Sequence, residues 1–177
     1  MSKQFSLKCL IISDQLVRGV PRQGACHDVF EMTRGFGSIY FESEFADQRL
    51  LGRFDLVLLS GHAKDKGRAI DIDGVDLVIP RHLAKVRARI VYLNACFAGR
   101  NAKLLSQCFC VLGATAAVAP ATEVPWGRCD NDATRTFARS ILAGLDVTDA
   151  VRACDPLWPV GNPYEAHLAS GTAHKTP

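Results

Sequence analysis

Two reactive side chains each follow an apolar run of the sequence. His62 comes shortly after residues 54–59, and Cys96 comes shortly after residues 89–93. Both runs have the length and the composition of a buried strand in a parallel sheet. The carboxyl ends of parallel strands meet at one edge of the sheet, where ligands bind. The spacing therefore predicts an imidazole and a thiol at a common site.

An imidazole beside a thiol makes a nucleophile. A free thiol has a pKa of about 8.5 and is mostly protonated at pH 7. A neighbouring imidazole takes its proton and can later protonate a leaving amine. The alternatives are that Cys96 is an ordinary buried cysteine and that His62 is a loop histidine without a role. The position of both residues after strands favours the nucleophile.

The elements that position this pair alternate between strand and helix. This alternation predicts one α/β domain with a mostly parallel sheet. We expect strands at 8–13, 38–41, 54–59, 89–93 and 109–119, and helices at 25–34, 80–86, 101–107, 131–143 and 148–155. Residues 47–51 are expected to form a short helical turn.

A hairpin and two irregular segments complete the predicted organisation. Asp73-Gly74 separates two short apolar runs, 70–72 and 75–79, and Asp-Gly supplies the positive φ that a tight hairpin turn needs. Residues 63–68 are polar and suggest a mobile loop. Residues 121–130 suggest a covering loop. The domain is expected to span 1–155, followed by an irregular tail at 156–177.

Composition excludes several classes of protein. The net charge of +3 and the lack of a basic block argue against a nucleic-acid partner. No apolar run is long enough to cross a membrane, and we expect no signal peptide. The seven scattered cysteines then suggest reduced thiols in the cytoplasm. No second cysteine pair lies at zinc-site spacing, so neither a metal nor another cofactor is expected.

With these segments placed, the chain resembles the caspase-like cysteine peptidases of the CHAT type. Four stretches carry the likeness: Ser60-Gly61-His62, the hairpin and helix at 70–86, the run Asn94-Ala95-Cys96-Phe97-Ala98-Gly99, and the pattern Phe137…Leu142-Ala143-Gly144…Ala150. The likeness covers 54–150 well and 8–41 more loosely. Its specific part is the order, with histidine before cysteine and each after a strand.

The resemblance implies a fold and a catalytic machinery. The fold is a caspase/haemoglobinase-like three-layer sandwich with a mostly parallel sheet flanked by helices and a small hairpin after the third strand. Cys96 would be the nucleophile and His62 the general base and acid. The oxyanion hole would use the backbone N–H groups of Cys96 and Ala63. The family usually has glycine where this chain has Ala63, which serves only if its φ is negative.

The resemblance also suggests substrate contacts. In related enzymes the first specificity pocket is lined from the end of the first strand and from two positions before the cysteine, here near Asp14 and at Asn94. An acidic Asp14 would favour a basic residue before the cut, although Asp is also common in turns. Glu123, Trp126 and Asp130 in the covering loop could also contact substrate; the sequence does not choose among these three.

The leading hypothesis is a cysteine endopeptidase that cuts a protein or peptide substrate. Regulation by a partner chain, or action on one protein target, is expected, because no regulatory domain is visible in the sequence. Bacterial relatives act in defence or regulated cell death, a role that the resemblance alone extends to this chain. The first alternative is a non-catalytic protein-interaction module on the same scaffold, which Ala63 favours. The second is a nucleotide or signalling domain, which lacks a glycine-rich phosphate loop after the first strand.

Overall fold

The computed structural model describes residues 7–13, 24–41, 50–72, 74–125 and 127–169. Its centre is a six-stranded sheet with the order β2-β1-β3-β7-β8-β9. Neighbouring strands are parallel except for β9, which pairs antiparallel with β8. The mixed α/β class with a mostly parallel sheet is thus confirmed. The strands are β1 (Cys9–Ser13), β2 (Ile39–Phe41), β3 (Leu51–Ser60), β7 (Lys85–Asn94), β8 (Ala116–Pro120) and β9 (Tyr164–Leu168).

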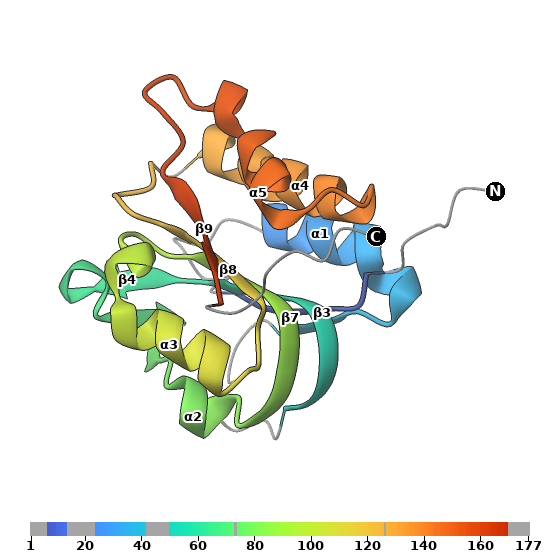
Figure 1. Cartoon of the computed structure of the whole chain (residues 1–177), viewed down its shortest axis with the longest axis vertical. Coiled ribbons are helices and arrows are strands. Elements are labelled where there is room, and N and C mark those ends of the chain that lie inside the picture. The colour runs from blue at the N-terminus through green and yellow to red at the C-terminus, as the bar shows by residue number, and fades with distance from the viewer. Residues whose placement is uncertain (1–6, 14–23, 42–49, 73, 126, 170–177) are drawn as a thin grey trace.

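Helices cover both faces of the sheet (Figure 1). On one face, Leu58 packs in a buried apolar cluster with Val29 and Phe137. On the other face, Leu59 packs in a second cluster with Leu104. The alternation of side chains along β3 supplies both clusters, since successive residues of a strand point to opposite faces. The first face carries α1 (Ala25–Thr33), α4 (Arg128–Leu142) and α5 (Val147–Arg152), and the second carries α2 (Ile79–His82) and α3 (Ala102–Cys110).

A second, three-stranded sheet follows β3 directly. It consists of β4 (His62–Lys64), β5 (Ala69–Ile72) and β6 (Val75–Asp76), all antiparallel. The predicted hairpin is confirmed, and Gly74 has the positive φ of 79° expected of its turn. Of the polar segment 63–68 that suggested a mobile loop, residues 63 and 64 belong to β4 and residues 65–67 form a short 3-10 turn. Ile70 and Ile72 are buried against the core of the main sheet, which holds the small sheet in place.

Other sequence-based expectations differ from the structure in the bounds of elements. The predicted strand 109–119 begins only at Ala116, because α3 continues through Cys110. The predicted irregular tail contains β9, whose paired residues lie 44 to 52 residues upstream (Pro120↔Tyr164 to Ala116↔Leu168). Strand β7 begins at Lys85, where the helix from residue 80 was expected to end. Of the helical turn expected at 47–51, residues 47–49 lie outside the described residues and Leu51 already belongs to β3.

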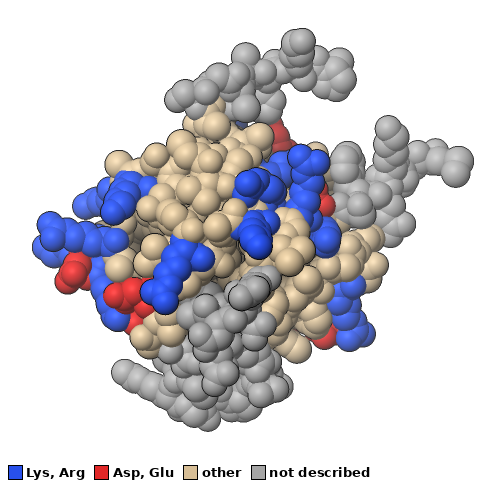
Figure 2. Space-filling model, turned by 90° about the horizontal axis from the view of Figure 1, so that it is seen from below, with Lys and Arg blue, Asp and Glu red and all other residues tan. Residues whose placement is uncertain are grey.

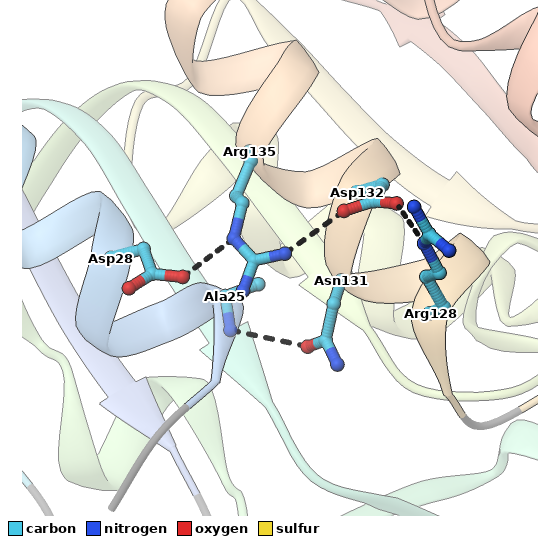
Figure 3. Close-up of polar contacts among 6 residues, drawn as sticks. All are labelled: Ala25, Asp28, Arg128, Asn131, Asp132 and Arg135. Atoms are coloured by element: carbon cyan, nitrogen blue, oxygen red, sulfur yellow. Dashed lines mark hydrogen bonds and ion pairs between the residues drawn. The ribbon is translucent and has the colours of Figure 1, made fainter.

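Helices α1 and α4 are joined by polar side chains (Figure 3). Gly24 provides no side-chain cap for α1, but the Oδ1 atom of Asn131 accepts a hydrogen bond of 3.1 Å from the N–H of Ala25. Arg135 of α4 lies 2.5 Å from Asp28 of α1 and 2.9 Å from Asp132. A helix-terminal N–H that lacks a local acceptor is therefore satisfied from a neighbouring helix.

The surface charge is dispersed on the face shown in Figure 2. Lys and Arg side chains lie at separate places on this face, among the residues drawn in colour, rather than in one block. Each helix in the described part of the chain is too short or too polar to span a membrane.

Candidate active site

The ends of β3 and β7 bring the two predicted motifs side by side. Ser60 is paired with Asn94 in the parallel register, so His62 and Cys96 each lie two residues beyond the same paired position. The N–H of Gly61 donates to the carbonyl of Asn94 at 3.1 Å. A side chain at Gly61 would place its Cβ 2.3 Å from the carbonyl oxygen of Asp71. Glycine is required here because β5 crosses so close to the chain.

The loops that follow the two motifs are also in contact. Gly67 has a φ of +87°, and a Cβ there would lie 2.5 Å from the carbonyl oxygen of Phe97. The Nδ2 atom of Asn101 donates to the carbonyls of Gly67 at 2.7 Å and Arg68 at 3.0 Å. The chain after His62 is therefore fastened to the chain after Cys96.

Backbone strain is concentrated in these loops. Within the described residues, the non-glycine residues with positive φ are Asp65 (49°), Lys66 (56°) and Phe97 (59°). Phe97 directly follows Cys96, and the other two lie in the loop after His62. Left-handed conformations of non-glycine residues cost free energy, and strained residues of this kind cluster at functional sites. The strain is thus a structural reason, independent of side-chain identity, to regard this region as a site.

The covering loop lies over Cys96. The N–H of Val124 points to the Sγ atom of Cys96 at 3.3 Å, and the carbonyl of Val124 is 3.9 Å from the same sulfur. The N–H of Phe97 donates to the carbonyl of Thr122 at 3.0 Å. The covering loop therefore contacts both the thiol of Cys96 and the backbone of the next residue.

His62 lies at the start of β4, with an exposed side chain opposite Asp71 of β5. Ala63 is extended and is not among the residues with positive φ. The sequence-based condition on Ala63 is therefore met, and its methyl group adds no backbone strain. Among the described residues, no acceptor is found for the backbone N–H of Cys96. The assignment of these two N–H groups to an oxyanion hole remains a prediction.

Polar side chains form a row beneath the site. Ser13, Ser60 and Asn94 end three neighbouring strands and are paired with one another in register. The side chain of Asn94 binds Ser60, Asp130 and Tyr164. Asp130 is buried in the first turn of α4, and Tyr164 begins β9. This row connects the strand that leads to Cys96 with two elements from the end of the chain.

The hydrogen bonds of this row lack one proton when Asp130 is ionised. The hydroxyl of Tyr164 lies 2.6 Å from Oδ1 of Asn94 and 2.8 Å from Oδ1 of Asp130, but it can donate to only one of them. A protonated Asp130 donates to the Tyr164 oxygen and completes the set. Burial also raises the pKa of Asp130 and raises that of Tyr164 well above its usual value. Both arguments indicate that Asp130 binds its proton more tightly than a solvated carboxyl group does.

The predicted substrate residues have different outcomes. Asp14 and Trp126 lie outside the described residues. Glu123 is exposed between the two residues of the covering loop that contact the Cys96 segment. Asn94 already binds partners at both ends of its amide. Their contacts with substrate remain predictions.

Sequence reasoning missed two residues of this region. Asp71 lies in the hairpin, where the alternation Ile70-Asp71-Ile72 indicated only a strand with one polar face. Tyr164 lies in the segment that was expected to be irregular. No local pattern signals either residue, because each reaches the site through long-range strand pairing.

The chain matches no model of a known protein family, and no curated protein matches it.

Proposed function

We propose that this protein is a cysteine endopeptidase of the caspase-like, CHAT type, with Cys96 as nucleophile and His62 as general base and acid. The observation that carries the proposal is the joining of the two motif loops. They begin at the paired residues Ser60 and Asn94 and meet again where Gly67 packs on Phe97. The parallel sheet, the helices on both faces and the small sheet after β3 support the caspase/haemoglobinase-like architecture that the resemblance implies.

The proposed reaction follows from the properties of the two side chains. The Cys96 sulfur transfers its proton to His62 and attacks the carbonyl carbon of a peptide bond, which forms a tetrahedral oxyanion. The backbone N–H groups of Cys96 and Ala63 stabilise this oxyanion. His62 then protonates the leaving amine, and water hydrolyses the thioester of the acyl-enzyme.

The alternative is a protein-interaction module on the same scaffold. The contact of Val124 with the Cys96 sulfur favours it, because the covering loop occupies one side of a thiol that is only partly exposed. Under the peptidase hypothesis the same contact makes this form a resting state, and a regulatory partner chain that moves the loop activates it.

The test combines a peptide panel with an alkylating probe on the full chain. We expect cleavage of at least one peptide, and a loss of on the order of 10²-fold or more in the cleavage rate for His62→Ala. Cys96→Ala should abolish cleavage. Cys110→Ala is the matched control, since Cys110 is an exposed free thiol on α3, and it should change nothing.

The outcomes separate the two functions. If His62→Ala leaves the alkylation rate of Cys96 unchanged and no peptide is cut, the peptidase proposal fails. If a partner protein binds equally well to Cys96→Ala, with an unchanged effect in cells, the interaction module is correct.

A further inference from the structure

A carboxylate lies opposite His62 in the small sheet. Asp71 of β5 is paired with His62 of β4 in an antiparallel register. Directly opposite residues of an antiparallel pair project to the same face, with Cβ atoms roughly 4.5–5.5 Å apart. The charge of His62 is close enough to contribute to lowering the pKa of Asp71. The imidazole and the carboxylate are thus neighbours on one face of this sheet.

Asp71 is held in place and charged. Its residue is only 9% exposed, its Oδ1 atom accepts a 2.9 Å hydrogen bond from the N–H of Gly74, and its Oδ2 atom binds the ammonium group of Lys64. The hydrogen bond from Lys64 is the main reason why the pKa of Asp71 is lowered. The carboxylate is therefore ionised at neutral pH, and its orientation is fixed from two sides.

The charges around His62 leave a negative excess. The ammonium group of Lys64 also binds Asp76 at 2.7 Å, so one cation is shared between two carboxylates. These three groups carry one net negative charge on the face that His62 occupies. Asp65, Lys66 and Arg68 follow in the same loop and are exposed to solvent. A protonated imidazole at His62 would balance the excess charge.

We propose that Asp71 is a positioning residue for His62, so that the site is a Cys–His–Asp arrangement assembled from β7, β4 and β5. This inference rests on the proposed function. Asp71 forms and breaks no bond in the reaction. The proton moves from the Cys96 sulfur to the imidazole, and the fixed carboxylate stabilises the positive charge that this transfer creates.

The test uses two substitutions with opposite signs. Asp71→Asn keeps the shape and removes the negative charge, so less thiolate should form at a given pH. Lys64→Gln leaves the carboxylates without their cation, so more thiolate should form. We measure the alkylation rate of Cys96 from pH 5 to 9 by mass spectrometry. In Asp71→Asn, alkylation of Cys96 should be roughly two- to fivefold slower at neutral pH, and the midpoint of its pH dependence should lie at higher pH. In Lys64→Gln, alkylation should be faster by a similar factor.

Two controls separate this effect from a general loss of structure. Asp28→Asn removes a carboxylate of α1 that is paired with Arg135 of α4, away from the small sheet. It should leave the pH dependence of Cys96 alkylation unchanged. In a His62→Ala background, neither Asp71→Asn nor Lys64→Gln should change the rate further. Destabilisation alone cannot slow one variant and accelerate the other. Lys64→Gln also carries the test by itself, because it removes only an exposed side chain.

Failure of this inference differs from failure of the peptidase proposal. If His62→Ala slows alkylation of Cys96 but the two charge variants do not shift it in opposite directions, the role of Asp71 is wrong and the dyad stands. If His62→Ala has no effect on Cys96, both proposals are overturned.

Discussion

At the residue scale, the fold changes the protonation of the Asp130 carboxyl group in a way that can be measured. Its folded-state pKa is raised by burial, so the folded chain holds this proton more tightly than the unfolded chain. The resulting stability is complete below the unfolded pKa of about 3.9 and is lost as the pH rises through the folded pKa. Asp130→Asn imitates the neutral acid, donating to Tyr164 and accepting from Asn94.

We therefore predict that the stability difference between Asp130→Asn and the unsubstituted chain grows in favour of the variant as the pH rises from about 4. Urea unfolding at a series of pH values measures this difference. A variant that is less stable by a constant amount at every pH would mean that the carboxyl group is ionised in the folded protein and that the proton count above is wrong.

At the scale of elements, the contact between the two loops depends on Gly67. Gly67 has a φ of +87°, and a Cβ there would lie 2.5 Å from the carbonyl oxygen of Phe97, so there is no room for a side chain. Gly67→Ala should destabilise the protein by about 2 kcal/mol or more, since a backbone clash adds to the strain of positive φ. It should also slow alkylation of Cys96, because the Phe97 carbonyl must move.

The matched control for this prediction is Gly37→Ala. Gly37 has nearly the same φ, +86°, but nothing lies within 4 Å of the place that a Cβ would take there. Gly37→Ala should lower the free energy of unfolding by only about 1 kcal/mol and leave the alkylation rate of Cys96 unchanged. Equal losses of stability in the two variants, measured by urea unfolding, would show that the loops are not coupled through Gly67.

At the scale of the whole molecule, the fold divides the cysteines into two groups. Burial raises the pKa of Cys9 and Cys108 to about 12 and the pKa of Cys26 and Cys154 to about 11. Cys96, Cys110 and Cys129 are at least partly exposed. We predict that an alkylating reagent at pH 7 labels these three thiols in the native protein.

The four buried thiols should react only when the protein unfolds, because the thiolate is the reactive form. Mass spectrometry of each cysteine-containing peptide at increasing urea concentration measures this. Labelling of Cys26 or Cys154 well below the unfolding transition would show that the helical layer of α1, α4 and α5 opens independently of the sheet.

Local sequence patterns were sufficient for the two central strands of the sheet. The apolar runs before His62 and Cys96 predicted β3 and β7, because a strand buried on both faces has a composition that no exposed segment shares. The Asp73-Gly74 turn predicted the hairpin for a similarly local reason. The same patterns were insufficient for β4 and β9, whose residues are polar or mixed and are held as strands by their partners.

The sequence by itself determined the order of the two reactive side chains and the strands that precede them. Only the tertiary structure decided which groups surround them: Val124 at the sulfur, Asp71 opposite the imidazole, and Tyr164 and Asp130 beneath Asn94. The physical reason is that strand register and loop contacts depend on residues distant in the chain. Each such contact is fixed by packing across the whole domain, which no local spacing records.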